Sequence, residues 1–116
     1  MDTRTTSKPN NRRASIRKPP RRTIRLQCRR GLFGLGLNLG TAIINVSETG
    51  AQVATNALLA VGDEVEIVFD GFGMRSTLKR VGDVRWATAQ DGGGSRAGIH
   101  FHKPLAFRDV QALSVP

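Results

Sequence analysis

Short runs in which apolar and polar residues alternate, separated by glycine-rich turns, constrain the fold of this chain most. Because the side chains of a strand point to opposite faces in turn, such runs predict half-buried β-strands. They occupy residues 22–29, 37–47, 51–56, 63–69, 74–87 and 97–101. Thirteen glycines and an aromatic content of 5% fit short strands and tight turns better than a helical bundle. A chain of 116 residues has room for one core, so we expect a single all-β domain.

Two parts of this pattern are irregular. In the run 74–87 the alternation breaks around Gly82, which predicts either one long strand bent at a bulge or two strands in succession. After the last run, Pro104 opens a segment in which Val110 and Leu113 recur at helical spacing. We expect a short C-terminal helix within residues 104–115 that closes one end of the β structure.

The positive charge is concentrated near the N-terminus. The formal net charge is +9, yet residues 1–30 hold eleven bases and one acid, a net charge of +10, while residues 31–116 carry −1. Residues 1–10 contain no apolar run, so we expect a disordered tail there and a folded domain over residues 11–116. A basic leader on a near-neutral body argues against a broad nucleic-acid surface.

Two features bear on the compartment. No apolar stretch approaches the roughly 20 residues of a membrane span, and the leader lacks the apolar region of a signal peptide, so we expect a cytoplasmic protein. The only cysteine, Cys28, follows Ile24 and Leu26 in an alternating run, which predicts a small buried side chain and no internal disulfide.

Catalytic chemistry finds little support in the sequence. His100 and His102 are the only histidines, and no cysteine or acid near them in the sequence offers a third metal ligand. Ser47 has no recognisable base partner, and the Gly-x-Ser-x-Gly motif of serine hydrolases is absent. We therefore predict a protein that is not an enzyme and has neither a metal nor a cofactor.

A polar niche is predicted at the end of the run 37–47. Strand alternation places Asn45 and Ser47 on one face and Val46 on the other, so the two polar side chains are expected to point away from the core. After a short connection, Gly50 supplies backbone freedom and close approach where the next strand begins.

Two short motifs meet in this part of the chain. An Arg-x-x-x-Arg sequence begins at Arg13, and an Asn-x-Ser-x-x-Gly sequence begins at Asn45. Together they resemble the signature of the PilZ domain, a bacterial receptor for cyclic di-GMP, and the resemblance runs from about Arg12 to Phe101. It implies a small six-stranded antiparallel β-barrel with a flexible basic N-terminal segment. In that arrangement the ligand lies between residues 11–21 and the barrel wall.

The resemblance also implies a set of ligand-binding residues. These are Arg13, Arg17, Asn45, Ser47 and Gly50. Arg12 would bind a second copy of cyclic di-GMP, and Gln52 and Arg96 are weaker candidates. The chemistry fits, because guanine O6 and N7 match the arginine fork, phosphodiesters accept the same donors, and an asparagine can accept from guanine or fix an arginine.

Two other functions stay open. One is a small barrel with a basic arm that binds RNA or DNA, although the body offers no obvious exposed aromatic pair to stack bases. The other is a PilZ-type adaptor that binds a protein and no nucleotide, although both motifs are intact. For the receptor, we expect the ligand to order the N-terminal segment and so pass the signal to a downstream protein.

Overall fold

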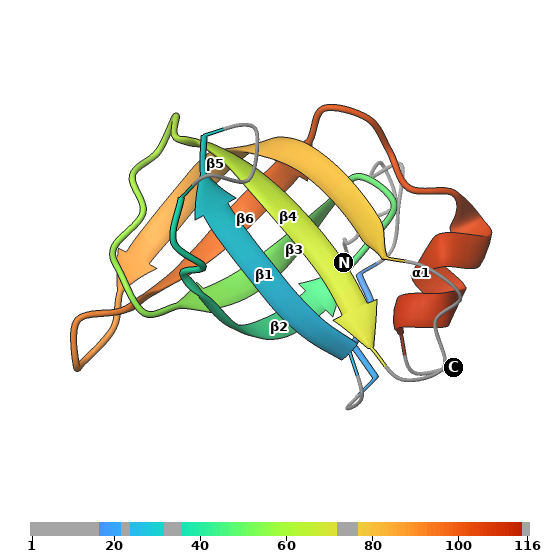
Figure 1. The fold of residues 1–116 in the computed structure, drawn as a ribbon, viewed down its shortest axis with the longest axis horizontal. Coiled ribbons are helices and arrows are strands. Elements are labelled where there is room, and N and C mark those ends of the chain that lie inside the picture. The colour runs from blue at the N-terminus through green and yellow to red at the C-terminus, as the bar shows by residue number, and fades with distance from the viewer. Residues whose placement is uncertain (1–16, 22–23, 32–35, 72–76, 115–116) are drawn as a thin grey trace, which may run out of the picture.

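The computed structural model describes residues 17–21, 24–31, 36–71 and 77–114. The described elements are, in chain order, β1 (Ile24–Arg30), β2 (Gly40–Val46), β3 (Gly50–Thr55), β4 (Glu64–Gly71), β5 (Leu78–Ala89), β6 (Ser95–Phe101) and α1 (Phe107–Leu113). The strands form one antiparallel sheet in the order β1-β4-β5-β6-β3-β2. The sheet curls until β1 and β2 come together, where the amide of Leu39 donates to the carbonyl of Cys28 over 2.7 Å (Figure 1). The predicted six-stranded antiparallel barrel is confirmed, and the structure shows that it is nearly closed.

Alternate residues of the strands fill the barrel interior. Phe69 and Phe101 lie at its centre with their rings 6.2 Å apart and nearly perpendicular, an arrangement that aromatic rings favour. Cys28 is fully buried, as predicted, and burial raises the pKa of its thiol to about 11. The thiol therefore behaves as a small apolar group rather than as a nucleophile.

Helix α1 closes one end of the barrel, at the right in Figure 1, as the sequence predicts. Leu105, Val110 and Leu113 are almost completely buried and join the core. The helix is shorter than expected because the chain is still extended at Ala106, with φ −70° and ψ 152°, so Pro104 does not begin it.

Residues 18–21 are fixed between β2 and α1. Lys18 exchanges two backbone hydrogen bonds with Val46, each 2.8 Å long. The amide of Arg21 donates to the carbonyl of Leu113, and its Nε donates to the carbonyl of Ser114 at the end of α1. Of the segment 11–21 that the resemblance implies beside the barrel wall, residues 18–21 therefore lie against β2 and the end of α1. The predicted tail, residues 1–10, lies outside the described residues.

Within the irregular run 74–87, residues 78–87 belong to a single strand, β5, and residues 74–76 lie outside the described residues. The register of β5 shifts between Val84 and Trp86, later in the chain than the break that the sequence suggested at Gly82. Gly82 is regularly paired, and a Cβ there would lie 2.6 Å from the carbonyl oxygen of His100. Close approach of β6 explains this glycine, and the bulge lies elsewhere. Within the described ranges, no helix is long and apolar enough to cross a membrane.

Candidate functional site

Strand pairing brings four outward-facing residues into one line across the sheet. Asn45 of β2 lies opposite Gln52 of β3, Gln52 lies opposite Gly98 of β6, and Gly98 lies opposite Trp86 of β5. We call these four residues the cross-strand row. Two candidates from the sequence, Asn45 and Gln52, thus lie side by side on the outer wall of the barrel.

Trp86 gives the row a flat aromatic end. A Cβ on Gly98 would lie 2.0 Å from the indole Nε1, so the indole rests directly on the backbone of β6. Its exposed fraction is nevertheless 38%, and part of the ring faces solvent. Sequence reasoning did not count Trp86 as a site residue, because its outward position depends on the bulge at Arg85, which alternation alone does not locate.

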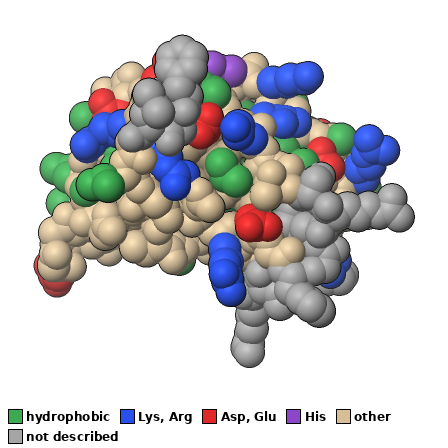
Figure 2. Space-filling view, viewed as in Figure 1, with side chains coloured by type: hydrophobic (Ala, Val, Ile, Leu, Met, Phe, Trp, Pro, Cys, Tyr) green, Lys and Arg blue, Asp and Glu red, His purple; other side chains and the backbone are tan. Residues whose placement is uncertain are grey.

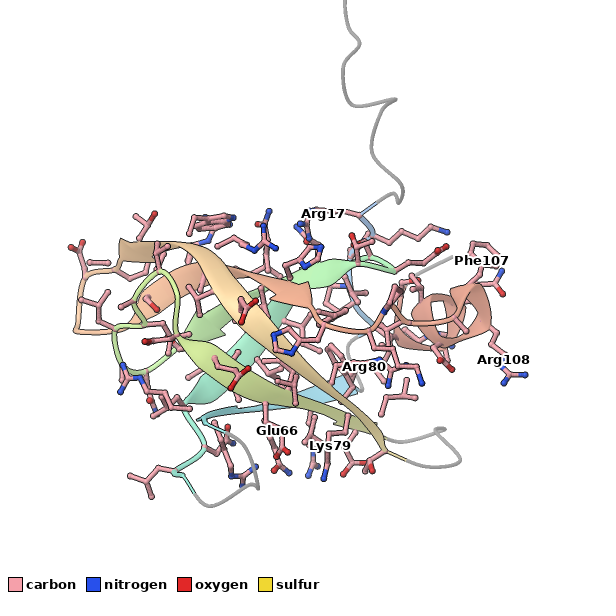
Figure 3. All side chains as sticks on the ribbon, turned by 90° about the horizontal axis from the view of Figure 1, so that it is seen from above. Arg17, Glu66, Lys79, Arg80, Phe107 and Arg108 are labelled. Atoms are coloured by element: carbon pink, nitrogen blue, oxygen red, sulfur yellow. The ribbon has the colours of Figure 1, made fainter. Side chains whose placement is uncertain are left out.

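Arg17 joins the row at its other end. Its Nη1 donates to Oδ1 of Asn45 over 3.2 Å. The backbone pairing of Lys18 with Val46 positions both side chains, because it aligns the N-terminal segment with the last residues of β2. Figure 3 shows Arg17 at the surface where this segment reaches the barrel. One arginine of the first motif and the first residue of the second motif are therefore in contact.

Ser47 does not stand beside Asn45. It is 1% exposed and lies beyond the end of β2, so the alternation does not extend to it. Its hydroxyl accepts from the amides of Gly50 at 3.2 Å and Thr49 at 3.3 Å, and its own amide donates to the carbonyl of Gly50. The prediction that Ser47 faces outward is wrong. Its polar group holds the turn between β2 and β3.

The packing of the strands explains why residue 50 is a glycine, without reference to any ligand. It lies opposite His100 on β6, and a Cβ there would lie 2.2 Å from the carbonyl oxygen of Ile99. No side chain fits without moving the backbone of one of the two strands. The glycine of the second motif therefore allows β3 and β6 to pair closely.

The remaining candidates divide into two groups. Arg96 is exposed on the outer face of β6, two residues before Gly98, so its guanidinium extends from the same face as the row. Arg12 and Arg13 lie outside the described residues.

With Arg17 at one end, the site offers guanidinium donors, an amide and an aromatic face. Such a set suits a ligand with flat bases and phosphate groups.

Comparison with known proteins agrees with the motifs. A family model described as the PilZ domain matches residues 11–114, which include both motifs and most of the chain. Among curated proteins, none matches the sequence significantly.

Proposed function

Because the chain belongs to the PilZ domain family, a family of cyclic di-GMP receptors, we propose that it binds cyclic di-GMP on the cross-strand row. The observation that carries the proposal is the hydrogen bond between Arg17 and Asn45, which joins the two motifs at one end of the row. Trp86 at the other end offers a surface on which a base can stack.

Each residue has a distinct role in this proposal. Arg13 and Arg17 donate to guanine O6 and N7 or to the phosphates, for which the planar arginine fork is well suited. Asn45 orients Arg17 and can accept from the guanine N1 or N2 donors. Ser47 and Gly50 act indirectly, since they shape the turn that presents Asn45.

Transmission of the signal is a further part of the proposal. The ligand orders the residues that precede Arg17, and the ordered segment is read by a downstream protein of the bacterial cytoplasm. The protein acts as a receptor and not as an enzyme. Amide hydrogen exchange tests this step: protection should appear around residues 12–17 when cyclic di-GMP binds. A segment that is equally protected with and without ligand contradicts it.

Nucleic-acid binding is the second candidate, because two aromatic side chains are exposed after all. Trp86 is 38% exposed on β5, and Phe107 is 57% exposed at the start of α1, where the Lys18 ammonium lies 5.7 Å from its ring centre. They belong to separate elements, and Figure 3 shows Phe107 beside the helix that closes the barrel. Base stacking on exposed aromatics is typical of proteins that bind single strands.

Calorimetric titration of the whole chain with cyclic di-GMP separates these functions, with GMP, ATP and single-stranded RNA as competitors. We expect saturable binding that the three competitors do not displace. Arg13→Ala and Arg17→Ala should each weaken binding by about 1–3 kcal/mol, the range of a good bidentate contact. Arg4→Ala removes the same charge from the predicted tail and is the matched control. Equal losses in all three variants would indicate nonspecific attraction by the leader.

A further inference from the structure

A second polar cluster lies on the outer surface of the barrel. Its residues come from β4, from β5 and from the segment just after β6. Glu64 of β4 lies opposite Asp83 of β5, and Asp83 lies opposite His100 of β6. Beyond the end of β6, His102 continues alongside β5, where its amide donates to the carbonyl of Val81 over 2.8 Å. One ligand atom each from Glu64, Asp83 and His102 lies within 4.8 Å of the other two. Three separate segments of chain therefore converge on one point.

From this convergence we propose that Glu64, Asp83 and His102 bind a divalent transition-metal ion, with zinc as the best match. The Nε2 of His102 lies 3.0 Å from Oδ1 of Asp83 and 3.7 Å from Oε2 of Glu64. Ligands about 2.0–2.2 Å from a tetrahedral zinc ion lie about 3.4 Å apart. The two distances bracket that value, and the ligand oxygens of Glu64 and Asp83 lie within 4.8 Å of each other, so rotation of the side chains can bring the three ligand atoms to the spacing around the ion.

The charges favour a cation at this point. Like charges directly opposite each other on neighbouring strands are unfavourable, and Glu64 and Asp83 form such a pair. Within the described residues, both carboxylates have their ion pairs with His102, which is charged only when it is protonated. A divalent ion bound by a neutral imidazole would balance both carboxylates.

The chemistry of the donors selects the kind of metal. One imidazole nitrogen with two carboxylate oxygens suits zinc and its transition-metal neighbours, whereas magnesium and calcium prefer oxygen ligands alone. The side chains of Glu64, Asp83 and His102 are 43%, 40% and 43% exposed, so an ion can reach them and keep water in a remaining position. Figure 2 shows histidine and acidic side chains at the surface of this face of the barrel.

The cluster removes the ground on which the sequence argued against a metal. That argument rested on the lack of a third ligand near the two histidines. The other two ligands, Glu64 on β4 and Asp83 on β5, are far from His102 in the sequence, and only the register of the sheet brings them to it. His100, which was paired with His102 in that argument, is not part of the cluster.

Calorimetric titration with Zn²⁺ alone tests the site, with the whole chain free of any histidine tag. We expect one saturable site and a rise in melting temperature on binding. His102→Gln and Asp83→Asn should each weaken binding at least about tenfold, because even residues that merely orient a ligand contribute that much. His100→Gln on β6 and Asp70→Asn on β4 are the matched controls, and each should bind zinc like the wild type.

NMR of the wild-type histidine side chains makes the test independent of whether a variant folds. Zinc should shift the Nε2 resonance of His102 and leave that of His100 nearly unchanged. Any of three results overturns the proposal: no saturable binding below millimolar zinc, equal losses in the control variants, or an equal response to Mg²⁺. Because no nucleotide is needed, the result is separate from the test of cyclic di-GMP binding.

Discussion

Replacing Ser47 by alanine should destabilise the barrel, although Ser47 belongs to a proposed ligand motif. The hydroxyl is buried and accepts from the amides of Thr49 and Gly50, and the substitution removes this acceptor from a site that water does not reach. Leaving buried polar groups without a partner costs about 1–3 kcal/mol. For a domain of this size, each kcal/mol lowers the melting temperature by roughly 4–8 °C.

Urea denaturation followed by the fluorescence of Trp86, the only tryptophan, measures this loss. Thr41→Ala is the matched control, since it removes an exposed hydroxyl from β2. Asn45→Ala should change the free energy of unfolding little, because Asn45 is only half-buried, but it should weaken cyclic di-GMP binding through Arg17. If Ser47→Ala unfolds at the same urea concentration as Thr41→Ala, the hydroxyl does not hold the turn and the reasoning fails.

Three further predictions follow from burial and close contact. Val46→Ala should cost 1 kcal/mol or more in urea denaturation, because it opens a cavity at a side chain with no exposed surface. Gly50→Ala should cost about 1–3 kcal/mol, because its Cβ meets the backbone of β6, and a wild-type melting curve would contradict this. Native Cys28 should resist iodoacetamide at pH 8.5, and rapid labelling would refute its burial. Because burial raises the pKa of the thiol to about 11, the free energy of unfolding should fall only as the pH rises from 9 to 11.

Local periodicity was sufficient to locate each of the strands in the described part of the chain, because a strand with one buried face must alternate. The observed strands begin and end within a few residues of the predicted ones, and β2 shows why the ends are harder to place. Alternation continues in the sequence through Ser47, but the chain leaves the sheet after Val46 because Ser47 bonds to Gly50. That turn sets the end of the strand, and the alternation of apolar and polar residues does not predict the turn.

The site was predictable only in part for the same reason. Asn45 and Arg17 came from their motifs, and the structure brings them into contact. Trp86 could not be assigned a face, because the bulge before it inverts the alternation. The cluster around His102 depends on pairing between strands that are distant in the sequence, which no local pattern encodes.

Mapping of chemical shifts during titration with cyclic di-GMP tests the central claim most directly, because it reports both binding and its location. The claim predicts saturable shifts that are largest at the indole Nε1–H of Trp86 and at the amides of Asn45 and Gln52. Leu58 and Val61, exposed in the loop between β3 and β4, should show no shifts and serve as the internal reference. The account is contradicted if saturating ligand leaves the cross-strand row unchanged, or if the largest shifts lie around Leu58 and Val61.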